Sequence, residues 1–230
     1  MSFEHVPGNL DAVLSRIARA AERAGRSPSD VKLVAVSKTF PVAAIEAAFA
    51  AGQRAFGENR VQELAEKAPV APEGVEWHLI GHLQTNKAAK AARLAHVIHS
   101  VDSERLLEKI AFTEVEAPRT ILLEVNVSGE ASKFGVSPDG AMALAEKAAA
   151  AGNVDLAGLM TMAPFGASER ELRGLFSALR GLRGRMEEAL GLRLPELSMG
   201  MSSDFEEAVM EGSTIVRVGT AIFGERVPKH

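Results

Sequence analysis

The chain has 230 residues, of which 47% are hydrophobic and 24% are charged; its formal net charge is −4 and it contains no cysteine. A chain of this length can bury about 70% of its unfolded surface, enough for one substantial core, so we expect a single domain over residues 1–230. The mild acidity argues against a general nucleic-acid or membrane-surface binder, and the missing cysteine excludes disulfides, thiolate metal sites and cysteine nucleophiles.

The first predicted element is a helix from Leu10 to Ala24, which ends at Gly25 before the break Ser27-Pro28. Short apolar runs then alternate with amphipathic stretches along the whole chain. Residues 34–36 are apolar at consecutive positions, which is the pattern of a parallel strand covered on both faces. The predicted strands are Leu33–Ser37, Ala55–Gly57, Trp77–Gly81, Val97–Val101, Ile121–Val127, Leu156–Met162, Leu197–Met201 and Ile215–Gly219.

Several of the helical stretches have recognisable starts. Ser137 precedes a proline and is a predicted N-cap, and Ser168 with Glu171, like Ser203 with Glu206, has the spacing of a capping box. Strands that alternate with helices imply a parallel sheet with crossover helices. Eight such units in 230 residues match a compact (β/α)8 TIM barrel with an extra N-terminal helix, and an open doubly wound sheet is the alternative.

Lys38 follows the first predicted strand and stands where a buried strand meets a polar turn. An amine in such a place is partly desolvated, and burial lowers the pKa of an amine, which supplies the neutral nucleophile that condenses with a carbonyl. Lys38 is therefore a candidate Schiff-base lysine. The alternative is a solvated lysine that merely ends a strand, because lysine side chains are mostly exposed.

The loops after the last two predicted strands form a candidate phosphate site, as they often do in barrels. Residues 198–203 lead directly into a predicted helix, so hydroxyls and free N–H groups meet at a helix N-terminus. The acidic residues that open this helix would repel a phosphate unless they point outward. Gly219 lets the backbone approach a ligand, and Thr220 offers an N–H group and a hydroxyl. Ser203 as a plain helix cap, and Arg217 in a buried ion pair, are the alternatives.

A carbonyl-reactive lysine and a phosphate cradle on one barrel face together indicate a phosphorylated carbonyl compound held as a Schiff base. Pyridoxal 5′-phosphate fits this description. A lysine Schiff-base aldolase would use the same two features, so the residues by themselves leave both possibilities open.

Five segments form an ordered set of motifs. They are Leu33–Thr39, Phe56–Glu63, Trp77–Lys87, Leu197–Asp204 and Val216–Gly224. In order and spacing, over nearly the whole chain, they resemble the motifs of the pyridoxal phosphate homeostasis protein family. The resemblance implies the fold-type III barrel, similar to the N-terminal domain of bacterial alanine racemase, and covalent binding of pyridoxal phosphate.

The resemblance also implies roles for individual residues. Lys38 would form the internal aldimine, Ser202, Gly219 and Thr220 would hold the phosphate, and Arg217 would face the pyridine nitrogen. Because the charge of arginine is permanent, a ring nitrogen that faces it stays unprotonated. An unprotonated pyridine is a weaker electron sink for carbanion chemistry.

The resemblance further places Asn59 beside the ring. Related racemases use a tyrosine and related decarboxylases often a cysteine from a second domain, and this chain contains neither residue. The resemblance therefore implies a protein of intracellular pyridoxal phosphate homeostasis, which buffers and delivers the cofactor without catalytic turnover. The alternative is a pyridoxal-phosphate-dependent racemase or lyase acting on small amino acids, with His82 as its second base.

The expected partners are pyridoxal phosphate and, transiently, its apo-enzymes, with no nucleic acid or membrane. No leader-like segment or run of about 18 apolar residues occurs, so we expect a cytoplasmic protein, and without an apolar heptad we expect a monomer.

Lys133 is either a mobile surface lysine or a second amine near the site. Along a strand, His78 and His82 would lie about 13 Å apart, too far to share a metal, so no metal site is expected.

Overall fold

The computed structural model describes residues 2–130 and 134–225. The strands are β1 (Lys32–Val36), β2 (Ala55–Glu58), β3 (Glu76–Leu79), β4 (Val97–Val101), β5 (Arg119–Glu124), β6 (Val154–Met160), β7 (Glu196–Ser198) and β8 (Ile215–Val218). Each strand pairs in parallel with the next along the chain, and β8 pairs with β1, so the sheet is a closed barrel. The predicted (β/α)8 barrel is confirmed. The open sheet is excluded, because an open sheet has two edges.

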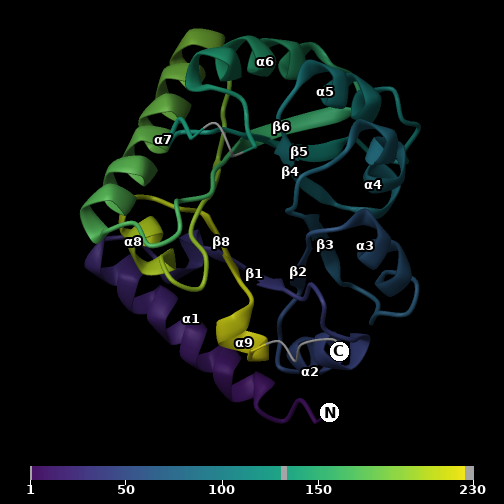
Figure 1. Ribbon diagram of the computed structural model, residues 1–230, viewed down its shortest axis with the longest axis vertical. Helices are drawn as coiled ribbons and strands as arrows, with labels where there is room; N and C mark the ends of the chain where they lie inside the picture. Colours follow the sequence, from purple (N-terminus) through teal and green to yellow (C-terminus); the bar gives the residue numbers. More distant parts are fainter. Residues whose placement is uncertain (1, 131–133, 226–230) are drawn as a thin grey trace.

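A helix follows every strand and one precedes the first, so the helices surround the barrel in Figure 1. Short 3₁₀ turns also occur at Pro28–Asp30 and Thr85–Lys87. None of the helices within the described residues combines the length and the apolar character that crossing a bilayer requires. The helices are α1 (Val6–Arg23), α2 (Val42–Ala50), α3 (Val61–Lys67), α4 (Ala88–Leu94), α5 (Glu104–Ala111), α6 (Pro138–Ala150), α7 (Glu169–Leu190), α8 (Phe205–Met210) and α9 (Thr220–Phe223).

The helix α1 packs on the outside of the last two helices. Its buried residues Val6, Leu10, Val13 and Ile17 recur every three or four positions and therefore share one face. That face meets α8 and α9, beside which α1 runs in Figure 1. Burial of each such side chain contributes about 1.5–3 kcal/mol. The helix begins before the predicted Leu10, because Pro7 favours a first helical turn.

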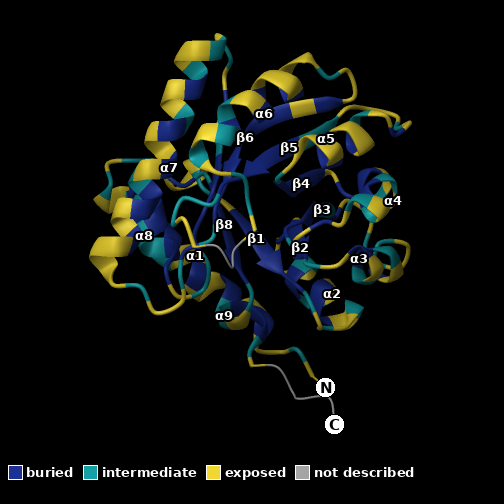
Figure 2. Cartoon of the chain, turned by 45° about the horizontal axis from the view of Figure 1, so that its top comes forward, coloured by how far each residue is buried: buried dark blue, intermediate teal, exposed yellow. Residues whose placement is uncertain are grey.

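The strands are buried on both sides, as the consecutive apolar positions predicted. Figure 2 shows them in dark blue inside helices whose outward faces are yellow. Val34, Ala55, Leu122, Met160 and Ile215 form a small apolar cluster separate from the main core. Since successive strand residues point to opposite sides of the sheet, this cluster occupies part of the barrel interior, and the main core lies between the sheet and the helices.

The strand β5 ends at Glu124, short of the predicted end at Val127. The Val125 N–H still donates to the Met160 carbonyl of β6 (2.8 Å). After it the backbone bonds to a later segment: the Asn126 N–H donates to the Val136 carbonyl (2.9 Å), and the Val136 N–H donates to the Glu124 carbonyl (2.8 Å). Val125 is buried all the same. The apolar pattern thus continues past the point where the regular ladder stops.

The strands β6 and β7 also end early, at Met160 and Ser198, where the sequence predicts ends at Met162 and Met201. After β7 the chain turns at Gly200, whose φ of 95° lies in the region that favours glycine. The strand β4 has the predicted bounds. The differences lie at both ends of the strands, because β5 and β6 also begin two residues before the predicted Ile121 and Leu156.

Two of the predicted helix starts are confirmed. The Ser137 hydroxyl accepts a hydrogen bond from the Gly140 N–H (3.2 Å). The Ser168 hydroxyl accepts from the Glu171 N–H (3.4 Å), and the Glu171 carboxylate accepts from the Ser168 N–H (2.8 Å), which completes a capping box. A cap of this kind contributes about 1 kcal/mol to helix stability.

Candidate functional site

The predicted site residues lie at the carboxyl ends of four strands that are neighbours around the barrel. The order β7, β8, β1, β2 is continuous because the sheet closes between β8 and β1. Closure of the barrel therefore brings residues that follow the first two strands next to residues that follow the last two strands. Lys38 follows β1, Asn59 follows β2, Ser202 follows β7, and Arg217, Gly219 and Thr220 lie at the end of β8.

A buried ion pair contacts the backbone of the loop that carries Lys38. The Lys67 ammonium donates to the Glu58 carboxylate (2.7 Å) and to the Ser37 carbonyl (2.9 Å). The Ser37 hydroxyl donates to the same Glu58 oxygen (2.7 Å). Lys67 and Glu58 are both buried, whereas Lys38 is half-buried. The backbone immediately before Lys38 is therefore fixed on the end of β2.

The residue after Lys38 adopts a left-handed backbone conformation. Thr39 has a φ of 69°, which is uncommon for a residue other than glycine. Its N–H donates to the Glu63 carboxylate (2.7 Å), which also lies 3.4 Å from Lys67 Nζ. Ser37, Glu58, Glu63 and Lys67, called here the Lys67 cluster, thus hold the backbone on both sides of Lys38.

The sequence interpretation missed the Lys67 cluster. Glu63 and Lys67 stand four residues apart on α3, and this spacing could have suggested a surface ion pair. Nothing local indicates that Lys67 reaches Glu58 and Ser37 inside the protein. Burial raises the pKa of Glu58, and Lys67 opposes that change.

The loops after β7 and β8 meet directly. The Gly219 N–H donates to the Ser202 hydroxyl (3.3 Å), and a Cβ atom at Gly219 would lie 3.1 Å from the Val36 carbonyl oxygen at the end of β1. The first intrahelical bonds of α9 are donated by Ile222 and Phe223, so the amide of Thr220 precedes them. Ser202 thus lies beside Gly219, whose neighbour in the chain is Thr220.

The predicted capping box at Ser203 and Glu206 is wrong. The helix α8 begins at Phe205, and the Asp204 carboxylate accepts a hydrogen bond from the Met201 N–H (2.6 Å) within the loop. Glu206 instead pairs with Arg16 of α1 (3.0 Å). Glu206 is therefore paired with α1, whereas Asp204 is buried within the loop after β7.

Arg217 is buried inside the barrel end, and its guanidinium is oriented by two neighbours. It donates to the Ser198 hydroxyl (2.6 Å) and to the Thr161 carbonyl (2.9 Å). These bonds use two of the five N–H donors of a guanidinium. Burial lowers the pKa of Arg217 to about 10, and the charges of Asp204 and Glu124 oppose that shift. The group stays cationic at neutral pH and is not part of an ion pair at salt-bridge distance among the described residues.

Glu124, at the end of β5, is a buried carboxyl that the sequence interpretation missed. It is 3% exposed, and its Oε2 atom has no hydrogen-bond partner among the described residues. Burial, together with the charge of Asp102, raises the pKa of Glu124 to about 7, and Arg217 opposes this shift. A carboxylate within the apolar run 121–127 was the signal that could have revealed it.

We expect Glu124→Gln to change how the stability of the protein depends on pH. The pKa of Glu124 is raised in the folded state, so its stabilising contribution is complete below about pH 4.5 and is lost as pH rises to about 7. The variant should gain stability relative to the wild type across this window, by at most about 1.4 kcal/mol per pH unit. Urea unfolding at a series of pH values measures the difference, with the exposed Glu116→Gln as the charge-removal control. Parallel pH profiles for wild type and Glu124→Gln would contradict the assignment.

Asn59 and His82, which the sequence analysis also considered for the site, lie at the same carboxyl end of the barrel. Asn59 Oδ1 is buried without a hydrogen-bond partner among the described residues, and Asn59 lines a groove of about 1640 Å³ beside the loops after β1 to β3. His82 is exposed; its Nδ1 lies 3.4 Å from the Asp102 carboxylate, and its ring stacks on Phe134 at 3.7 Å. Lys133 lies outside the described residues.

Comparisons with known proteins identify the family of the chain. The model of the alanine racemase N-terminal domain matches residues 8–227. The pyridoxal phosphate homeostasis protein of Aquifex aeolicus is 43% identical over 221 residues, which cover 94% of this chain and 96% of that protein. The protein of the same name from Escherichia coli K12 is 40% identical over 228 residues and 95% of both chains.

Solved structures agree with this assignment. PipY of Synechococcus elongatus is 42% identical; its structure without pyridoxal phosphate has a TM-score of 0.83 and covers 92% of this chain, and its structure with pyridoxal phosphate bound has a TM-score of 0.78 and covers 90%. Alanine racemase of Corynebacterium glutamicum shares only the fold, with a TM-score of 0.70 at 19% identity, and this chain covers 60% of it. With 40–43% identity over nearly its whole length, the chain belongs to the pyridoxal phosphate homeostasis protein family.

Proposed function

We propose that this protein binds pyridoxal 5′-phosphate through Lys38 and serves the homeostasis of that cofactor. The observation that carries the proposal is a half-buried lysine at a strand end, whose flanking backbone is held rigidly by the Lys67 cluster, next to the joined β7 and β8 loops. Relatives that bear the homeostasis name, and PipY with pyridoxal phosphate bound, support it.

The residues present fit this cofactor. Gly219 packs against β1, where a Cβ atom would lie 3.1 Å from the Val36 carbonyl oxygen, so the β8 loop can lie close to the strand that precedes Lys38. The Thr220 amide and hydroxyl stand beside it at the start of α9. The buried Asn59 Oδ1 has no hydrogen-bond partner among the described residues, as expected of a group that waits for a ligand.

Each residue has a distinct role in this proposal. Pyridoxal phosphate, when bound, supplies an aldehyde that condenses with an amine and releases water. Lys38 provides the amine, while Ser202, Gly219 and Thr220 hold the phosphate by hydrogen bonds. Arg217 would face the ring nitrogen, and because it stays cationic it would keep that nitrogen unprotonated.

The proposal extends to delivery of the cofactor. A protein that holds pyridoxal phosphate by a reversible bond can release it to apo-enzymes on transient contact, and we place this exchange in the cytoplasm with the protein as a monomer. Sedimentation analysis of the loaded protein measures the oligomeric state. Transfer to an apo-enzyme is measured by the activity that the enzyme regains.

The experiment that tests the proposal is a visible absorbance spectrum of the purified protein before and after borohydride reduction, with peptide mass mapping. We expect a yellow protein whose reduced pyridoxyl group maps to Lys38. A colourless protein that also fails to take up added pyridoxal phosphate would overturn the proposal.

Thr220→Val should weaken retention of the cofactor without preventing its covalent attachment. Loss of a hydrogen bond to a charged acceptor costs about 1.5–3 kcal/mol, so the dissociation constant should rise by about tenfold to a hundredfold. Thr220→Ser keeps the hydroxyl and should retain wild-type affinity. Equilibrium dialysis of the loaded proteins gives the constants. Equal affinities for Thr220→Val and wild type would show that the phosphate lies elsewhere.

A further inference from the structure

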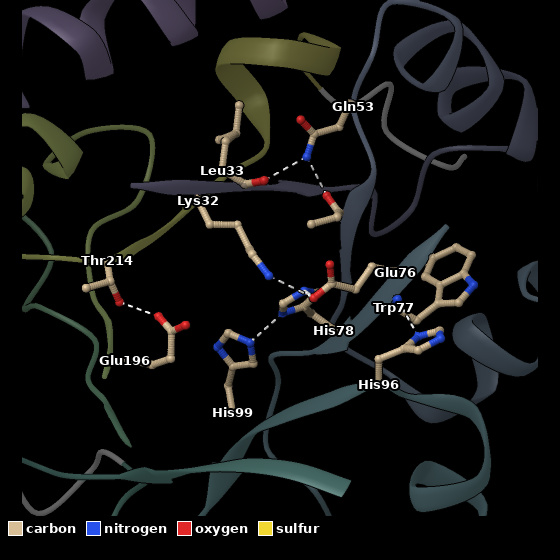
Figure 3. A network of polar contacts seen from close by, with 11 residues as sticks. Lys32, Leu33, Gln53, Glu76, Trp77, His78, His96, His99, Glu196 and Thr214 are labelled. Carbon is tan, nitrogen blue, oxygen red and sulfur yellow. Dashed lines mark hydrogen bonds and ion pairs between the residues drawn. The ribbon is translucent and has the colours of Figure 1, made fainter. Parts of the chain in front are cut away.

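A continuous line of hydrogen bonds runs through the barrel from one end to the other. At the site end, the Arg217 guanidinium donates to Ser198 Oγ (2.6 Å), and this hydroxyl lies 2.8 Å from His99 Nδ1. His99 Nε2 lies 2.8 Å from His78 Nδ1, and His78 Nε2 lies 3.0 Å from the Glu76 carboxylate. Figure 3 shows Glu76, His78 and His99 pointing toward one another in the barrel interior.

The two ends of this line differ in their access to solvent. His78, His99 and Ser198 are fully buried, whereas the Glu76 side chain is 34% exposed at the amino end of β3. There Glu76 also accepts a hydrogen bond from Lys32 (3.0 Å), the first residue of β1. The line therefore connects the candidate cofactor site with the opposite mouth of the barrel.

Only donation from Arg217 toward Glu76 gives every side chain in this line a suitable hydrogen-bond partner. A guanidinium cannot accept a hydrogen bond, so Ser198 must accept from Arg217 and is free to donate its single proton to His99 Nδ1. His99 then carries its proton on Nε2 and donates to His78 Nδ1, and His78 donates from Nε2 to Glu76. In the reverse direction, Ser198 would accept twice and its own proton would have no partner in the line.

The charges around the line agree with this direction. Burial lowers the pKa of His78 and His99, so both imidazoles are neutral near pH 7; Lys32 and Arg217 act in the same direction on His99, and Glu76 opposes the change at His78. The hydrogen bond from His78 lowers the pKa of Glu76 to about 2, so Glu76 is a carboxylate. A carboxylate accepts only, which fixes the far end of the line.

We propose that Glu76, His78 and His99 are positioning residues for Arg217, which act through Ser198. The carboxylate orients both imidazoles, and the Ser198 hydroxyl that donates into this line becomes a stronger acceptor for the guanidinium. The guanidinium of Arg217 is thereby held in place at the end of the barrel that carries Lys38. The role of Arg217 toward a ring nitrogen rests on the proposed function, whereas its orientation by the line does not.

The barrel offers a matched control at the same mouth. Glu196, the first residue of β7, also places a carboxylate at the amino end of the barrel, where it accepts from the Thr214 hydroxyl (Figure 3). Among the described residues, Glu196 is not a hydrogen-bond partner of His78 or His99. Glu76→Gln and Glu196→Gln thus remove the same charge from the same mouth, but only Glu76→Gln changes the acceptor that ends the line.

The first experiment uses nitrogen-15 NMR on the cofactor-free protein. We expect both His78 and His99 as neutral imidazoles protonated on Nε2 at pH 7 to 8, and slow solvent exchange of the Arg217 guanidinium protons. Replacing a charged acceptor by a neutral one should speed that exchange about fivefold in Glu76→Gln and leave it unchanged in Glu196→Gln. A proton on Nδ1 of either imidazole, or equal exchange rates in the two variants, would overturn the inference.

The second experiment measures how the orientation of Arg217 affects bound pyridoxal phosphate. In Glu76→Gln, pyridoxal phosphate should dissociate about fivefold faster than in the wild type, with a shifted visible absorbance maximum, while Glu196→Gln should match the wild type. If the wild type retains cofactor on Lys38 and neither variant changes its release, the positioning role is wrong and the proposed function stands. If the wild type retains no cofactor, the proposed function fails, and the cofactor-free NMR alone decides the inference.

Discussion

Lys38→Ala should contain no pyridoxyl group after incubation with pyridoxal phosphate and borohydride. The variant lacks the amine that would condense with the aldehyde, and no reduction product can then be fixed at residue 38. The fold should persist, because Lys38 belongs to neither apolar cluster and follows the strand. Intact-mass spectrometry measures the adduct, and circular dichroism checks the fold.

Lys38→Arg is the matched control for charge. It keeps a cation at the strand end but offers no amine that condenses at neutral pH, so it should lose the adduct as completely as Lys38→Ala. A full adduct in either variant would move the attachment to another lysine, and Lys133→Ala would then be the next variant to make.

Lys67→Met should cause the largest loss of stability among these variants. Lys67 and Glu58 form a buried pair at 2.7 Å, with side-chain exposures of 10% and 0%. Removing one partner of such a pair leaves an uncompensated buried charge and costs about 3–5 kcal/mol. The Ser37 carbonyl loses a donor in the same step, so the Lys38 loop should also hold cofactor less tightly. Urea unfolding measures the first effect and the rate of cofactor release the second.

The double variant Glu58→Gln/Lys67→Met separates the buried charge from the lost packing. It removes both charges and should recover most of the stability, since replacing a buried ion pair by neutral groups of similar size is often close to neutral. The cost of Lys67→Met should also grow with pH above about 4.5, because burial raises the pKa of Glu58 and a protonated carboxyl needs no counter-ion. The exposed Lys90→Met controls for removal of a lysine. A cost below about 1 kcal/mol would mean that the pair is effectively solvated.

The sequence alone predicts the barrel because its signal is local. Apolar runs that alternate with amphipathic stretches report which segments are buried on both sides and which on one, and eight such units leave few arrangements. The same order places Lys38, Asn59 and Arg217 at strand ends, and parallel strands bring their carboxyl ends to one face. The resemblance to a family adds the cofactor, which the residues alone left open.

Only the tertiary structure shows how these residues are held. His99 and Ser198 are 99 positions apart and meet because closure of the barrel aims both side chains into its interior. Lys67 looks like a surface helix lysine until α3 packs on the sheet and brings its ammonium to Glu58 and Ser37. Local patterns report the burial of a side chain, but its hydrogen-bond partner is set by how distant strands come together, and that contact decides its charge and orientation.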